Sequence, residues 1–134
     1  MKRLLIADDN EVNLRLIAEY MQHAGFDVTA VGGGVDCLAE LGKGNYDCII
    51  LDIQMPEVDG FAVLRELRGS MVREVRSTPV LALTALAYPR DRLKCEDAGA
   101  SLYLAKPVSF REVAAHVRAL IDDHQASLFS EILD

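Results

Sequence analysis

The stretch Cys48-Ile49-Ile50-Leu51-Asp52 is a short apolar run that ends abruptly at a carboxylate. An unbroken run of Ile and Leu of this length is typical of a parallel strand that is buried on both faces. Three other runs have the same form and also end at a polar residue: Leu4-Leu5-Ile6-Ala7 before Asp8, Val80-Leu81-Ala82-Leu83 before Thr84, and Leu102-Tyr103-Leu104-Ala105 before Lys106. Open α/β sheets bind ligands beyond the carboxyl ends of their strands, so we expect these polar residues to converge there.

Helical patterns separate the apolar runs. Apolar residues recur at helical spacing from Leu14 to Met21, and shorter patterns cover residues 35–42, 61–67 and 89–98. The clearest helix follows a Ser109-x-x-Glu112 capping box and carries Phe110, Val113, Ala114, Val117, Leu120 and Ile121 on one face. With a short strand at residues 28–31, the pattern predicts an α/β fold. This is a flavodoxin-like, doubly wound, five-stranded parallel sheet in the order 2-1-3-4-5 with five helices.

Two connecting segments carry weaker signals. Residues 71–77 are predicted to be a polar connection whose arginines, together with Arg65 and Arg68, form a solvated face. Gly32-Gly33-Gly34 lacks the Lys and the Ser or Thr of a phosphate-binding P-loop, so we predict a flexible turn there.

The length of 134 residues and the hydrophobic content of 51% suit one compact domain. We expect this domain to occupy residues 1–124 and a tail to occupy residues 125–134. If the tail is helical, it forms an apolar stripe of Leu128, Phe129, Ile132 and Leu133. The tail could then extend the last helix, pair with a partner, or be the remnant of a linker.

Charge and composition exclude several classes of protein. The net charge of −7 argues against nucleic-acid binding. No apolar run approaches the roughly 20 residues of a membrane span, and Asp8-Asp9 interrupts the first run too early for a signal peptide. Cys37, Cys48 and Cys95 are odd in number and lack C-x-x-C spacing, so neither a disulfide framework nor a zinc site is indicated. We therefore expect a cytoplasmic protein with reduced thiols and no membrane insertion.

The expected cluster of Asp8, Asp9 and Asp52 contains an electrostatic conflict. Two like charges about 4 Å apart repel by roughly 4 kcal/mol at an effective dielectric constant of about 20, so the three cannot all stay ionised unaided. A hard cation held by carboxylate oxygens and waters would resolve this, which fits Mg²⁺. Lys106 adds a point charge suited to phosphoryl oxygens, and Thr84 adds a hydroxyl donor. An aspartate can itself be the nucleophile that forms an aspartyl phosphate.

One aspartate at a strand end is more often a helix N-cap or a turn residue than a reactive group. The prediction therefore depends on the coincidence of four strand ends. Five motifs accompany them: Asp8-Asp9-Asn10, Ile50-Leu51-Asp52-Ile53-Gln54-Met55-Pro56 with Asp59-Gly60, Leu83-Thr84-Ala85, Ala98-Gly99-Ala100, and Tyr103-Leu104-Ala105-Lys106-Pro107. Over nearly all of the chain, this set resembles the receiver domain of two-component response regulators, in its chemotaxis-type single-domain form. The resemblance implies a phosphoacceptor switch, not an enzyme with independent substrate turnover.

The resemblance also implies individual roles at the acidic cluster. Asp52 matches the aspartate that accepts a phosphoryl group from a phosphohistidine on a histidine kinase or a histidine phosphotransfer protein. Asp9, Asp52 and the backbone carbonyl of Gln54 match the Mg²⁺ ligands, and Asp8 matches the acid that acts through a metal-bound water.

Further roles concern the phosphoryl group and its readout. Thr84 and Lys106 match the groups that bind the phosphoryl oxygens. Tyr103 matches the switch aromatic that turns inward when the threonine hydroxyl is drawn toward the phosphoryl group, and Pro107 matches a proline that follows a cis peptide bond. Leu86 cannot orient a water, which predicts a phosphoryl group that lasts longer than in the fastest chemotaxis-type members.

The resemblance further implies a downstream protein target, bound at the face around the fourth helix, the fifth strand and the fifth helix. The expected oligomeric state is a monomer or a weak dimer. Three alternatives stay open. The chain could be a receiver module from a hybrid histidine kinase or a multidomain regulator. It could be a Mg²⁺-dependent phosphohydrolase with an aspartyl nucleophile, although such enzymes have a second acid where this chain has Gln54. It could also be a pseudo-receiver that only binds partners, although the intact acid set argues against this.

Overall fold

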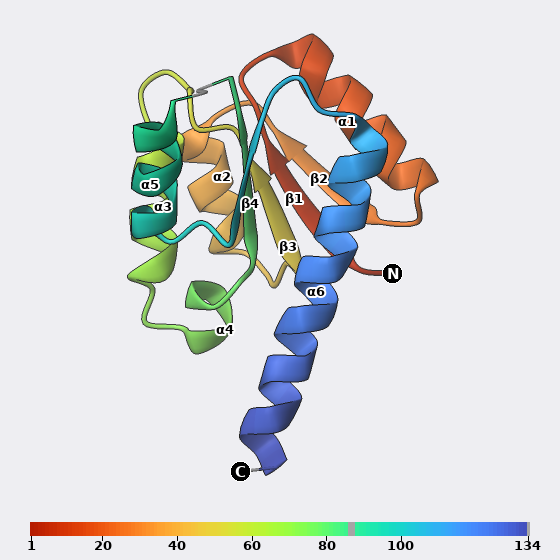
Figure 1. Cartoon of the computed structure of the whole chain (residues 1–134), viewed down its shortest axis with the longest axis vertical. Helices are drawn as coiled ribbons and strands as arrows, with labels where there is room; N and C mark the ends of the chain where they lie inside the picture. The colour runs from red at the N-terminus through yellow and green to blue at the C-terminus, as the bar shows by residue number, and fades with distance from the viewer. Residues whose placement is uncertain (86–87, 134) are drawn as a thin grey trace.

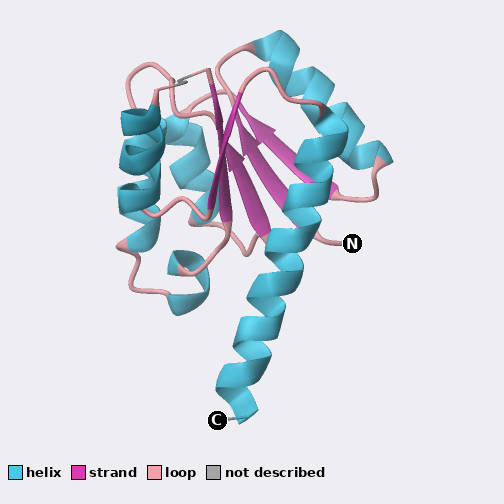
Figure 2. Cartoon of the chain, viewed as in Figure 1, coloured by secondary structure: helices cyan, strands magenta, loops and turns pink. Residues whose placement is uncertain are grey.

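Five parallel strands form one sheet in the order β2-β1-β3-β4-β5 in the computed structural model, which describes residues 1–85 and 88–133 (Figures 1 and 2). The strands are β1 (Arg3–Ala7), β2 (Asp27–Val31), β3 (Cys48–Leu51), β4 (Val80–Thr84) and β5 (Leu102–Ala105). The predicted doubly wound order is therefore confirmed. The four apolar runs of the sequence are β1, β3, β4 and β5, and all but the last are almost completely buried.

Six helices connect and cover the strands in the described part of the chain. They are α1 (Glu11–His23), α2 (Gly34–Leu41), α3 (Gly60–Arg68), α4 (Arg73–Arg76), α5 (Pro89–Ala98) and α6 (Phe110–Leu133). Five of them were predicted. The prediction of five helices misses α4, which is a short turn within the polar connection of residues 71–77, because four residues are too few to show an apolar periodicity.

Helix α6 begins at the predicted capping box, where the backbone N–H of Glu112 donates to Oγ of Ser109 at 3.1 Å. The helix then continues through the predicted tail as far as Leu133. The division into a domain of residues 1–124 and a tail of residues 125–134 remains a prediction. Among the helices that the structure describes, none has the length and apolar character needed to cross a bilayer.

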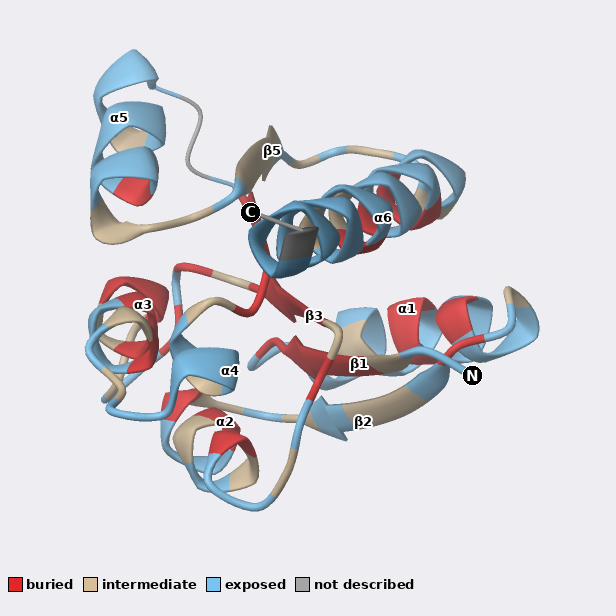
Figure 3. Cartoon of the chain, turned by 90° about the horizontal axis from the view of Figure 1, so that it is seen from below, coloured by how far each residue is buried: buried red, intermediate tan, exposed pale blue. Residues whose placement is uncertain are grey.

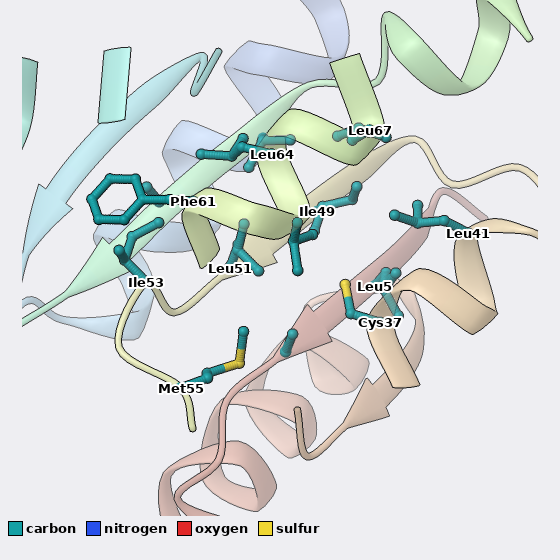
Figure 4. Close-up of a cluster of buried hydrophobic side chains, with 14 of the residues drawn as sticks. Leu5, Cys37, Leu41, Ile49, Leu51, Ile53, Met55, Phe61, Leu64 and Leu67 are labelled. Carbon is teal, nitrogen blue, oxygen red and sulfur yellow. The ribbon is translucent and has the colours of Figure 1, made fainter. Parts of the chain in front are cut away.

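The sheet separates two apolar clusters, because successive side chains of a strand point to opposite faces. Leu5, Ile49 and Leu51 pack with α2 and α3, as Figure 4 shows, while Leu4 and Ile6 pack with α1 and α6 on the other face. Seen from below, the buried residues of the helices lie on the sides that face the sheet (Figure 3). This two-sided core fixes the strands rigidly, so their carboxyl ends form a stable platform.

Gly34 is part of a helix, where the sequence analysis predicted a flexible turn. Gly32 and Gly33 form the bend, but Gly34 is the first residue of α2 and is buried. A Cβ atom at this position would lie only 2.2 Å from the backbone oxygen of Val58 in the loop before α3. The prediction failed here because the need for glycine comes from a distant segment of the chain.

Arg68 is not on a solvated face, so that part of the prediction is wrong. Its Nε donates to the carbonyl of Gly99 at 2.9 Å, and one terminal nitrogen donates to the carbonyls of Arg76 at 2.8 Å and Thr78 at 2.6 Å. Partial burial lowers the pKa of its guanidinium. Gly99 has φ of +110°, and a Cβ there would lie 2.6 Å from Cγ of Arg68. Arg68 therefore joins the end of α3 to the end of α4, to the loop before β4 and to the end of α5.

The substitution Arg68→Met is expected to lower the free energy of unfolding by about 2 kcal/mol, because three carbonyls lose a charged donor. Chemical denaturation monitored by circular dichroism measures this loss. Arg65→Met is the matched control, since Arg65 is exposed one turn earlier on the same helix, and we expect a change below about 0.5 kcal/mol. Equal losses in the two variants would show that the carbonyl contacts of Arg68 add no measurable stability.

Candidate functional site

The carboxyl ends of the central strands bring three aspartates together. Ala7 pairs with Leu51 in the sheet, so Asp8 and Asp52 leave neighbouring strands side by side. One carboxylate oxygen from each of Asp8, Asp9 and Asp52 lies within 4.8 Å of the other two. Asp8 is 7% exposed, whereas Asp9 is open to solvent. The convergence that the sequence predicts is therefore present.

Lys106 bridges two of these carboxylates. Its Nζ lies 3.3 Å from Oδ2 of Asp8 and 3.3 Å from Oδ2 of Asp52. Lys106 directly follows β5, and β4, which ends at Thr84, lies between β5 and β3. The side chain of Lys106 therefore approaches the aspartates from the β5 side of Thr84. The peptide bond between Lys106 and Pro107 is cis.

Backbone N–H groups hold the other oxygen of each bridged carboxylate. The N–H of Asn10 donates to Oδ1 of Asp8 at 2.9 Å, and the N–H of Gln54 donates to Oδ1 of Asp52 at 3.0 Å. An aspartate that accepts from the N–H two residues later forms an Asx turn. Sequence analysis did not predict that the backbone N–H of Asn10 orients the carboxylate of Asp8. The signal that could have indicated it is an aspartate followed two residues later by a residue that favours turns.

Burial raises the pKa of the Asp52 carboxyl above its ordinary value. The charge of Lys106 and the N–H of Gln54 oppose this shift, and the nearby charge of Asp8 adds to it. The cluster contains three carboxyl groups and a single ammonium group. Carboxylate oxygens that converge beside solvent are the donor set that hard divalent cations prefer. Asp8, Asp9 and Asp52 thus fit a Mg²⁺ ion that keeps part of its water shell.

Thr84 and Tyr103 belong to the last two strands of the sheet, β4 and β5. Thr84 is completely buried at the end of β4, and Tyr103 pairs with Ala82 of the same strand. The buried hydroxyl of Tyr103 has no hydrogen-bond partner among the described residues. A buried hydroxyl without a partner carries a cost of about 1–3 kcal/mol, so hydrogen bonding does not stabilise the hydroxyl in this position. Leu86, for which a slow loss of the phosphoryl group was predicted, lies outside the described residues.

A hollow of about 220 Å³ opens beside the cluster. Its lining includes Asp8 and Lys106 together with Asn13 and Phe110. Sequence analysis assigned Phe110 to the core and gave Asn13 no role. Only the packing of α1 against the start of α6 shows that both residues border the site.

A model of the response regulator receiver domain family matches residues 4–118. The chain belongs to this family. A curated relative, the transcriptional regulatory protein HprR of Escherichia coli K12, is 38% identical over 92% of the chain. The hybrid signal transduction histidine kinase L of Dictyostelium discoideum is 36% identical over 83% of the chain. The receiver spans 53% of the length of the first relative and 7% of the second.

A solved structure extends the comparison to the site. The receiver domain of the sensor histidine kinase PA1611 from Pseudomonas aeruginosa PAO1 has a magnesium ion coordinated in its active site cleft. It is 33% identical to this chain, with a TM-score of 0.82, and 90% of this chain and 98% of that chain are covered. Receiver domains of this family therefore occur both in response regulators and in histidine kinases.

Proposed function

We propose that this receiver domain accepts a phosphoryl group on Asp52 in the presence of Mg²⁺ and acts as a switch for a downstream protein target. The observation that carries the proposal is the cluster in which Asp8 and Asp52 share the ammonium of Lys106 and Asp9 completes the acidic set. In-line phosphoryl transfer needs mainly positioning and neutralisation of charge. This cluster contains the groups for both.

Asp8, Asp9 and Asp52 would hold the Mg²⁺ ion, together with the predicted carbonyl of Gln54. The bound ion supplies positive charge to the phosphoryl oxygens during transfer. The N–H of Gln54 fixes the carboxylate of Asp52, so that its lone pair attacks phosphorus while the bond to the leaving group breaks and its electrons leave with the donor. Lys106 can then move from the carboxylates to a phosphoryl oxygen. Because the phosphoryl group stays on Asp52, the chain assists its own modification and its reversal without turnover of an independent substrate.

The switch in this proposal involves Thr84 and Tyr103. A phosphoryl oxygen would draw the Thr84 hydroxyl toward Asp52. Because β4, which contains Thr84, pairs with β5, which contains Tyr103, this movement would change the space next to Tyr103. The buried hydroxyl of Tyr103, which has no hydrogen-bond partner in the described part of the chain, supports two accessible positions of the ring. Phosphorylation would then favour one of two existing arrangements by differential contacts.

The surface of α1 supports docking of the phosphodonor. Val12, Leu16 and Tyr20 recur every four residues and are exposed by 56%, 47% and 38%. The ring of Tyr20 lies 5.8 Å from that of Phe110, which borders the hollow beside Asp8. We propose that a histidine kinase or a histidine phosphotransfer protein packs a helix on this stripe and presents its phosphohistidine to Asp52.

Incubation with acetyl phosphate and Mg²⁺, followed by intact mass spectrometry, tests the proposed function. We expect one phosphoryl adduct, which hydroxylamine removes because it cleaves acyl phosphates, and no adduct when EDTA replaces Mg²⁺. Sustained release of phosphate from small phosphoesters would instead favour a phosphohydrolase. Absence of an adduct with acetyl phosphate and with a panel of phosphorylated phosphotransfer proteins would favour a receiver that only binds partners.

A further inference from the structure

The second half of α6 extends beyond the sheet at the amino ends of the strands, opposite the end that carries the aspartates, as Figure 1 shows. There it forms a groove of about 440 Å³ with α4 and the loop before β3. We call this the distal groove; residues that line it include Asp47, Glu74, His124, Leu128, Glu131 and Ile132. An exposed ion pair between Arg73 and Glu131 joins α4 to the extension of α6.

The distal groove has an apolar part that is exposed to solvent. Leu128 and Ile132 are one helical turn apart and line the groove, yet they are 39% and 80% exposed. They continue the face of α6 that Val117 and Ile121 bury against the sheet. Apolar side chains that continue a core face past the end of the sheet, beside a groove, form a surface suited to another helix.

Most of the charged residues that line the distal groove are acidic. Asp47, Glu74 and Glu131 line it, and Arg73, the one Lys or Arg among its described lining residues, is already paired with Glu131. The chain contains no Lys or Arg after Arg118, but it contains four acids there: Asp122, Asp123, Glu131 and Asp134. A second copy of this chain would bring the same negative charges, and like charges at close range repel. The charge of the groove therefore favours a positively charged occupant.

We infer that the distal groove binds a basic, amphipathic helical segment of a protein partner. Its apolar face packs on Leu128 and Ile132, and its Lys and Arg side chains lie against the carboxylates of Asp47 and Glu74. The groove lies at the amino ends of the strands and Asp52 lies at their carboxyl ends, so the bound helix would not occupy the site of phosphoryl transfer. The inference goes beyond the proposed function and does not depend on it.

Fluorescence anisotropy with a labelled synthetic helix of about 15 residues, made of Leu and Lys with the Leu residues on one face, tests the inference. A scrambled peptide of the same composition, without an apolar face, is the control for simple attraction to a negative protein. We expect the amphipathic peptide to bind at least about tenfold more tightly than the scrambled one, because only it buries Leu128 and Ile132. Its affinity is expected to fall as salt rises.

Three variants locate the binding. The double substitution Leu128→Ser and Ile132→Ser is expected to weaken binding at least about tenfold. Glu74→Gln is expected to reduce the salt dependence. Phe129→Ser is the matched control, because Phe129 is 62% exposed on the same helix and is not among the groove-lining residues. We expect the affinity of this variant for the amphipathic peptide to stay within about twofold of the wild-type value. Equal melting temperatures and unchanged adduct formation with acetyl phosphate would show that all variants are folded.

Three results would overturn the inference. Equal binding of the amphipathic and scrambled peptides, or unchanged binding by the double variant, would show that net charge alone attracts the peptide. A reversible dimer in sedimentation equilibrium that the double variant abolishes would identify the occupant as a second copy of the chain.

Discussion

Asp52→Asn is expected to abolish the phosphoryl adduct that acetyl phosphate forms with the wild type in the presence of Mg²⁺. The amide keeps the size of the carboxylate and can still accept the N–H of Gln54, but its oxygen is far less nucleophilic. Asp9→Asn is expected to slow adduct formation at least about tenfold, because it removes one carboxylate from the predicted metal ligands while Asp52 stays intact. Intact mass spectrometry over a time course measures both effects.

Asp97→Asn is the matched control for these substitutions. Asp97 is exposed on α5 and does not belong to the acidic cluster, so its adduct should form at the rate of the wild type. An adduct of normal yield on the Asp52→Asn variant would assign the phosphoryl group to another residue and refute the role proposed for Asp52. A normal rate for Asp9→Asn would show that Asp9 does not help to hold the cation.

The position of the cluster was predictable because four signals of the same kind coincide. The strands before Asp8, Asp52 and Lys106 are unbroken apolar runs, and the rule that parallel strands point the same way brings their ends together. The sheet order followed from the handedness of crossovers, which leaves few topologies. Local sequence is sufficient for such features because each depends on one strand and one general rule.

Features that depend on contacts between distant segments were not predictable in this way. Arg68 looks like other surface arginines in the sequence, and its role comes from carbonyls of Arg76, Thr78 and Gly99, which only the folded chain brings near it. The requirement for glycine at Gly34 comes from the approach of the loop before α3. The apolar stripe of the tail was visible in the sequence, but its surroundings depend on α4, a helix too short to leave a pattern.

Lys106→Met is expected to destabilise the protein by about 2 kcal/mol at pH 7 in EDTA, because it removes the ammonium that two largely buried carboxylates share. The loss should depend on pH. As pH falls toward about 4, protonation of Asp52 removes negative charge that Lys106 balances, so wild type and variant should differ less. Thermal or chemical denaturation from pH 4 to pH 7 measures the difference.

The direction of this pH dependence follows from the raised pKa of Asp52. As pH rises above about 4, the unfolded chain releases its carboxyl protons first, while folded Asp52 retains its proton. The folded state then binds more protons than the unfolded state, so stability falls as pH increases. Lys106 lowers the pKa of Asp52 in the wild type and limits this fall. Without the lysine, the fall toward pH 7 should be steeper.

Two further variants separate the charge of Lys106 from its packing. Lys2→Met removes an exposed lysine away from the site and should follow the wild type at every pH. Adding Asp52→Asn to Lys106→Met should recover part of the lost stability, because the double variant contains one uncompensated carboxylate fewer, while Asp8 remains. A loss that is the same at every pH, and that Asp52→Asn does not reverse, would mean that Lys106 stabilises the fold through the packing of its methylene groups. The site would then owe its order to the backbone turns of Asp8 and Asp52, with no measurable contribution from the shared ammonium.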